Sequence, residues 1–92
     1  MMISVKFFAT FSEAFGAEER EVELEDGCSV LDLLDNLCDT SERYAMLFVG
    51  HAKLKPYVKI LKNGRFIEHL DGLYTQLFDG DSVRIFPPVG GG

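Results

Sequence analysis

The chain is poor in the residues that mark several common classes of protein. Its 92 residues contain no tryptophan, two cysteines, two histidines and three prolines, and acidic residues outnumber basic ones by 15 to 9. The formal charge of −6 argues against nucleic acid as a partner, because phosphates demand a basic surface. An acidic chain is compatible with a basic protein partner.

Long hydrophobic runs are also missing. No apolar stretch approaches the roughly 20 residues of a membrane span, and no basic segment followed by a long apolar stretch marks a secretion signal. We therefore expect no membrane association and a cytoplasmic protein. Cys28 and Cys38 then predict reduced thiols, not a disulfide framework. His51 and His69 lack a Cys or His partner at zinc-site spacing, so we predict no metal site.

The first part of the chain predicts two strands in one small domain that spans residues 1–92. Residues 2–9 alternate, with three apolar side chains on one face and Phe8 on the other, mostly polar, face. Residues 20–25 alternate between apolar residues and glutamates, as in a half-exposed antiparallel strand. Residues 10–17 contain a glycine and predict a loop or short turn, which joins the two strands as a hairpin.

Ser29 begins the main predicted helix. It is a good N-cap, and Asp32 completes a capping-box pattern. Apolar residues then follow at i, i+3, i+4 and i+7, which is one helical face: Val30, Leu33, Leu34 and Leu37. Cys38 extends this face as a small buried residue. For residues 39–50, a short second helix from Ser41 through Phe48 and an irregular connection both remain open.

The second half predicts three more strands. Residues 57–62 form a strand, Asn63-Gly64 is a strong hairpin signal because both positions tolerate positive φ, and residues 65–69 form the return strand. Residues 73–77 predict one tight helical turn, and residues 82–86 the last strand. The order predicts an α+β fold, a mixed sheet of four to five strands with one main amphipathic helix packed on one face.

The last stretch of the chain is its most unusual feature: Phe86-Pro87-Pro88-Val89-Gly90-Gly91-Gly92. The two prolines have fixed φ and no N–H, so they end strand pairing and favour an extended exit. The glycines carry no side chain and suit passage through a narrow tunnel, with the terminal carboxylate at the tip. We expect residues 87–92 to form a flexible reactive tail. Disordered slack, or a remnant of cloning, is the plain alternative.

Three aromatic residues fall on the polar side of their strands, each beside a charged residue: Phe8 beside Lys6, Phe66 beside Glu68, and Phe86 beside Arg84. Large aromatic residues on a solvated sheet face form an apolar patch beside the root of the tail, and such patches mark protein interfaces. Lys6 and Arg84 are expected to pair with acidic groups of a partner. The alternative is that a loop or helix covers this face and buries the phenylalanines.

These features together resemble the ubiquitin-like (β-grasp) sulfur carriers, and most closely the small subunit of molybdopterin synthase; archaeal ubiquitin-like modifiers are also similar. The segments that carry the resemblance are residues 3–9, Asn63-Gly64-Arg65, Asp79-Gly80-Asp81-Ser82-Val83 and residues 85–92. The family commonly ends in a glycine pair preceded by a small residue, and Gly90 takes that position here. Residues 39–56 match least.

The resemblance implies a mechanism in which the chain carries the reacting group and its partners supply catalysis. An E1-like adenylating enzyme uses ATP to activate the Gly92 carboxylate, and a sulfur donor enzyme then converts it to a thiocarboxylate. The tail inserts into the large, catalytic subunit of molybdopterin synthase, where the sulfur builds molybdopterin. The chain is then no enzyme on its own and binds no cofactor itself. The family docks its partners through an apolar sheet surface near the tail, to which Phe8, Phe66 and Phe86 correspond.

Other functions remain open. A ubiquitin-like modifier needs the same tail, conjugated through Gly92 to lysines of target proteins. Carriers for thiamine or tRNA thiolation are variants of the leading hypothesis. A plain binding module with an idle tail predicts that loss of Gly91 and Gly92 has no effect, whereas a reactive tail predicts complete loss of function.

Overall fold

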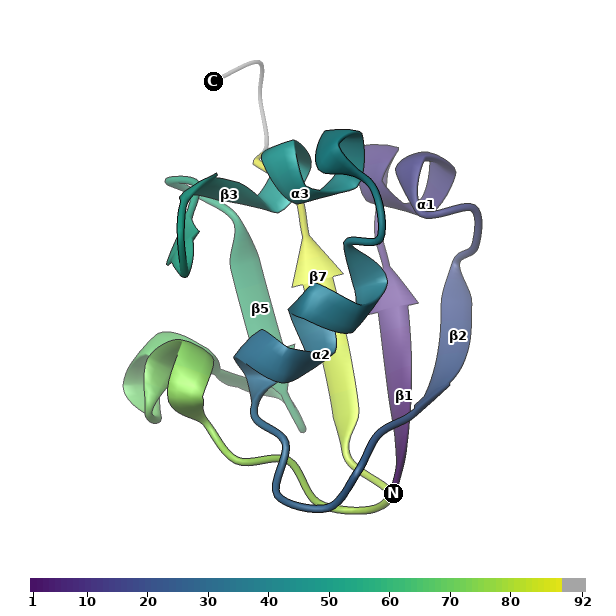
Figure 1. Ribbon diagram of the computed structural model, residues 1–92, viewed down its shortest axis with the longest axis vertical. Helices are drawn as coiled ribbons and strands as arrows, with labels where there is room; N and C mark the ends of the chain where they lie inside the picture. The colour runs from purple at the N-terminus through teal and green to yellow at the C-terminus, as the bar shows by residue number, and fades with distance from the viewer. Residues whose placement is uncertain (89–92) are drawn as a thin grey trace.

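The first and last strands of the chain pair in parallel at the centre of one mixed sheet, in a computed structural model that describes residues 1–88 (Figure 1). The strand order is β2-β1-β7-β5-β6. These strands are β1 (Met2–Phe7), β2 (Glu19–Glu23), β5 (Lys59–Lys62), β6 (Arg65–Phe66) and β7 (Ser82–Phe86). The central pair, β1 and β7, is parallel, and the other pairs are antiparallel. The predicted α+β architecture is confirmed, and the mixed sheet, predicted to have four to five strands, has five.

The inner face of the sheet is formed by the alternate apolar residues that the sequence indicates. In β1 these are Ile3, Val5 and Phe7, and all three are buried. The parallel register sets Val5 opposite Val83 and Phe7 opposite Ile85, so the two central strands present one continuous apolar surface. A sheet with one apolar face must bury it against another layer.

Helix α2 (Val30–Leu37) provides that layer and lies across the sheet in front of β7 in Figure 1. The predicted capping box is present. The Asp32 N–H donates to Ser29 Oγ at 3.3 Å, and the Ser29 N–H donates to the Asp32 carboxylate at 2.8 Å. The four predicted apolar residues are all buried, whereas Cys38, predicted to be buried, is only half-buried at the C-cap. No helix within residues 1–88 has the length and apolar character needed to cross a membrane.

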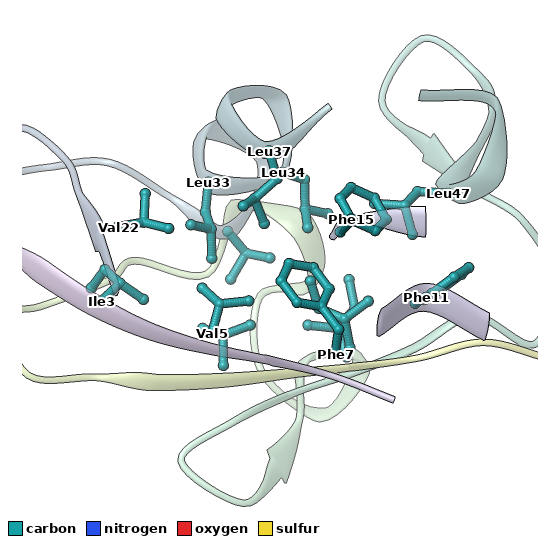
Figure 2. Packing of buried hydrophobic residues seen from close by; sticks show 14 of the residues in the cluster. Ile3, Val5, Phe7, Phe11, Phe15, Val22, Leu33, Leu34, Leu37 and Leu47 are labelled. Atoms are coloured by element: carbon teal, nitrogen blue, oxygen red, sulfur yellow. The ribbon is translucent and has the colours of Figure 1, made fainter. Parts of the chain in front are cut away.

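Helix α1 (Thr10–Ala14) corrects the prediction of a loop or short turn between the first two strands. Phe11 and Phe15 lie four positions apart and are both buried, as the core view shows (Figure 2). The Phe15 ring stacks on Phe7 with centroids 4.8 Å apart and meets Phe11 edge to face at 6.1 Å. This aromatic spacing is a helical signal that outweighs Gly16, which lies just past the helix with φ +74°.

Helix α3 (Ser41–Leu47) decides the open question for residues 39–50 in favour of a second helix. The Thr40 side chain caps it by accepting the Arg43 N–H at 3.1 Å. Arg43 also ties α3 to α1, because its Nε donates to the Ala14 carbonyl at 3.1 Å. A small two-stranded hairpin follows that the sequence did not predict, formed by β3 (Phe48–Gly50) and β4 (Lys53–Leu54).

Several predicted elements are shorter in the structure. The strands predicted at 2–9 and 20–25 end at Phe7 and Glu23, and the strand predicted at 57–62 begins only at Lys59. The Asn63-Gly64 turn is confirmed, with φ of 49° and 83° and Lys62 opposite Arg65.

The return strand of this hairpin is the largest correction. It was predicted to span residues 65–69, but β6 ends at Phe66 and the chain continues as the 3₁₀ helix η1 (Ile67–His69). The alternation that paired Phe66 with Glu68 therefore does not hold. A second 3₁₀ helix, η2 (Gly72–Tyr74), replaces the helical turn predicted at 73–77.

A buried carboxylate fixes the beginning of β7. Asp81 accepts hydrogen bonds from Asn63 Nδ2 at 2.9 Å and from the Phe78 N–H at 2.8 Å. Asn63 Oδ1 in turn accepts the Ser82 N–H at 2.9 Å. Burial favours a higher pKa for Asp81, but these hydrogen bonds and the nearby Lys62 ammonium outweigh burial and lower the pKa. The hairpin turn and the last strand are thus held together.

Candidate functional site

The root of the tail is anchored on the domain. Strand β7 ends at Phe86, Pro87 is buried, and Pro88 is half-buried. The chain therefore leaves the sheet from a fixed point, at the upper end of β7 in Figure 1. Val89, Gly90, Gly91 and Gly92 lie outside the described residues, so the predictions for them remain predictions.

The structure brings two of the three predicted surface aromatics into direct contact. The rings of Phe8 and Phe86 stack with centroids 4.2 Å apart and planes 11° from parallel. The parallel register sets Lys6 opposite Arg84, so the residues two positions further along each chain become neighbours on the same face. Both rings are half-buried, partly by each other. The alternation along each strand predicts that each ring lies on the outer face, and the parallel register of β1 and β7 brings the two rings into contact.

Phe66, the third surface aromatic, lines an apolar groove at the tail root and is 40% exposed. Leu61 lies opposite Phe66, and Lys59 lies opposite Phe86, so β5 forms the floor between them. The groove has a volume of about 360 Å³ and is lined by Tyr57, Lys59, Leu61, Phe66, Phe86 and Pro87. Because Phe66 and Arg84 remain exposed, the described part of the chain leaves this face open.

Three residues of this groove were not singled out from the sequence. Leu61 and Lys59 follow from the same alternation that places Ile60 in the core, so a signal for them existed. Tyr57 follows from no such pattern, because it precedes β5 in a turn.

Three basic side chains lie on this sheet face near the aromatic residues. Lys6 and Arg84 are opposite each other on β1 and β7, while Lys59 lies opposite Phe86 on β5, two residues from the Leu61 that faces Arg84. The Lys59 ammonium lies 3.2 Å from the Glu68 carboxylate, but both side chains are about half exposed, so this pair is weak and exchangeable. Strand β2 presents glutamates on the same face, with Glu19 opposite Lys6, so the face is mixed in charge. Arg84 and Lys59 lie on its β7 and β5 side, next to the groove, where they suit a partner that presents carboxylates.

The thiol of Cys38 is unsuited to act as the reactive group. Burial, followed by the nearby carboxylates of Asp35 and Asp39, raises its pKa to about 11. The thiolate is the nucleophilic form of cysteine, and little of it exists near neutral pH at such a pKa.

Comparison with known proteins identifies the family. A profile of the ThiS family matches residues 5–92. The chain belongs to the ThiS family. It is 41% identical over 92 residues to small archaeal modifier protein 3 of Haloferax volcanii, with all of both chains covered. It is also 33% identical over 95 residues to the molybdopterin synthase sulfur carrier subunit of Chlamydomonas reinhardtii, again with all of both chains covered.

The fold of this ThiS-family chain is shared with solved relatives. The solution structure of small archaeal modifier protein 1 from Methanosarcina acetivorans matches with a TM-score of 0.81 and 37% identity, covering 99% of this chain and 96% of that one. The predicted ubiquitin-like β-grasp fold is therefore confirmed. The family match extends over the groove and the tail, while the names of the relatives divide between protein modifier and sulfur carrier.

Proposed function

We propose that this ThiS-family chain is a sulfur carrier that serves as the small subunit of molybdopterin synthase. An E1-like enzyme adenylates the Gly92 carboxylate with ATP, and a sulfur donor enzyme converts the adenylate to a thiocarboxylate. The observation that carries the proposal is the junction at Phe86 and Pro87. There, the central strand of the sheet ends at an open apolar groove, and the residues of the glycine tail follow next in the sequence.

The chemistry explains why the chain needs partners. A carboxylate is a poor electrophile. In adenylation one carboxylate oxygen attacks the α-phosphorus of ATP and expels pyrophosphate, so that AMP, bound through this oxygen, becomes the leaving group on the carbonyl carbon. The terminal sulfur of a donor persulfide attacks the carbonyl carbon and expels AMP. A second thiol then cleaves the acyl disulfide, leaving the thiocarboxylate on Gly92 and a disulfide on the donor. The carrier contributes the reacting carbon and its position, while its partners supply acid–base catalysis and ATP.

The sheet face supplies the docking surface in this proposal. The stacked rings of Phe8 and Phe86, with Phe66 beside them, form the apolar centre that a partner covers. Lys6 and Arg84 flank this centre and pair with carboxylates of the partner, which favours correct orientation and fast association. The large synthase subunit and the activating enzyme bind this face in turn, because each must reach the same tail.

A second candidate function is a ubiquitin-like modifier, in which a lysine amine of a target attacks the activated Gly92 carbonyl and forms an isopeptide bond. The observation that favours it is the 41% identity to a protein named as a modifier, over the full length of both chains. Adenylation is common to both functions, and the acceptor distinguishes them. A carrier for thiamine or tRNA thiolation uses the same first steps.

The deciding experiment is intact mass spectrometry of the protein from its native host, combined with a blot for conjugates of higher mass. A gain equal to one sulfur replacing one oxygen at Gly92 supports the carrier, and a ladder of lysine conjugates without it supports the modifier. Both together indicate a dual role. A host that makes molybdopterin but shows neither product refutes the proposal. A chain lacking Gly92 is the control and should yield neither.

A further inference from the structure

Tyr57 occupies a backbone position that disfavours a tyrosine. Residues 55–58 form a turn closed by the Val58 N–H, which donates to the Lys55 carbonyl at 3.3 Å. Pro56 and Tyr57 are its central residues, and Tyr57 has a φ of 69°. The third position of such a turn is normally glycine or asparagine, because a bulky side chain is strained at positive φ. The chain thus holds an aromatic residue where a smaller one relieves strain.

Burial in the core does not explain this choice, because Tyr57 is 73% exposed. Its side chain forms one wall of the groove at the tail root, together with Phe66 and Phe86. Strain retained at an exposed residue beside a candidate site indicates a role in binding more than in stability. Tyrosine is well suited to this role, since its rigid ring offers a large contact area at little loss of side-chain entropy.

We infer that Tyr57 is a binding residue for the enzyme that adenylates Gly92, and that this enzyme places an aliphatic side chain between Tyr57, Phe66 and Phe86. Lys59 and Arg84 then receive carboxylates of the same enzyme. The inference rests on the adenylation step of the proposed function, which the carrier and the modifier share, and it extends the docking surface beyond the aromatic residues on the strands.

Chain length and charge argue for this occupant. Gly92 is five residues beyond the buried Pro87, so even a fully extended tail spans at most about 18 Å from it. An enzyme that holds Gly92 in its active site must therefore lie close to the groove. A second copy of this chain fits less well, because pairing two such faces brings Lys59 and Arg84 toward like charges.

The test uses ATP–pyrophosphate exchange by the adenylating enzyme of the same host, with the carrier as varied substrate. Tyr57→Asn relieves the turn and removes the ring, while Tyr57→Phe keeps the ring. We expect Tyr57→Asn to raise KM about tenfold with little change in kcat, because a docking residue does not touch the reacting carbon. Its melting temperature should equal or exceed that of the wild type. Tyr57→Phe should keep the wild-type KM.

Tyr74→Ala is the matched control, since Tyr74 is 67% exposed on η2 and is not among the residues lining the groove. It should leave KM unchanged. An unchanged KM for Tyr57→Asn, a loss confined to kcat, or a lower melting temperature overturns the role of Tyr57 while leaving the proposed function intact. Failure of the wild-type chain to be adenylated overturns both.

Discussion

Replacing Asp81 with alanine tests whether the beginning of the tail-bearing strand is held by its buried carboxylate. Asp81 is 9% exposed and accepts hydrogen bonds from Asn63 Nδ2 and the Phe78 N–H, at 2.9 and 2.8 Å. Alanine leaves both donors without this acceptor. Losing the two hydrogen bonds to the carboxylate lowers the free energy of unfolding, and we expect a loss of about 3 kcal/mol. The loss is not larger because Asn63 is exposed, so its amide can form a hydrogen bond with water instead. For a domain of this size, such a loss lowers Tm by about 12–24 °C.

The assay is urea denaturation followed by far-ultraviolet circular dichroism, since the chain contains no tryptophan. Asp71→Ala is the control, because Asp71 is exposed and its side chain makes no capping hydrogen bond at η2. A loss for Asp81→Ala within about 0.5 kcal/mol of the control refutes the reasoning, because that is the usual effect of a surface substitution.

The pH dependence provides an independent arm of the same test. The folded-state pKa of Asp81 is lowered below its ordinary value of 3.8, so its ionised form stabilises the fold above that pH. The stabilisation is lost as pH falls through the lowered folded-state pKa. Asp81→Asn does not titrate, so its deficit relative to wild type should be constant from pH 7 to about pH 5 and shrink below pH 4. A deficit independent of pH contradicts this account.

Three further predictions follow from particular contacts. Ser29→Ala removes one half of the capping box and should lower the free energy of unfolding by about 1 kcal/mol in urea denaturation, whereas an unchanged midpoint argues against a role in stability. Phe86→Glu breaks the ring stack with Phe8 on the outer face of the sheet. It should weaken binding to the activating enzyme in a pull-down titration, while thermal melting stays cooperative. Loss of cooperative melting would instead assign the ring to the core. Burial and nearby carboxylates raise the pKa of Cys38 from 9.0 to about 11. Its thiol should therefore react with iodoacetamide at pH 8 about 100-fold more slowly in the folded protein than in urea. Equal rates in the two states contradict its burial.

The elements that were correctly predicted are those whose signals are local. Ser29 and Asp32 satisfy each other across one helical turn, so helix α2 is fixed by neighbours in sequence. Asn63 and Gly64 accept positive φ, which selects the tight hairpin wherever the turn is placed. Phe11 and Phe15 carry the spacing of helix α1, but the helix has only five residues and is followed by Gly16, so its periodic pattern is too short to distinguish a helix from a turn.

In the candidate site, too, the features that the sequence predicts are those with local signals. Alternation alone assigned Phe8, Phe66 and Phe86 to an outer face, since side-chain direction in a strand depends only on sequence parity. The two prolines and three glycines of the tail also predict a thin, extended segment from composition alone, whereas the thiocarboxylate chemistry expected of it is what the resemblance to sulfur carriers implies.

Only the tertiary structure decided which outer residues meet. Phe8 and Phe86 stack because β1 and β7, from opposite ends of the chain, pair in parallel, and no local pattern specifies that register. Tyr57 reaches the groove from a turn in which its φ is positive, a conformation that tyrosine disfavours, so local propensity does not predict its position. Ile67 leaves the predicted strand and begins η1 as a buried residue, which shortens β6. In each case contacts distant in sequence outweigh local preference, because burial and pairing across the sheet contribute more free energy than the propensity of a single residue.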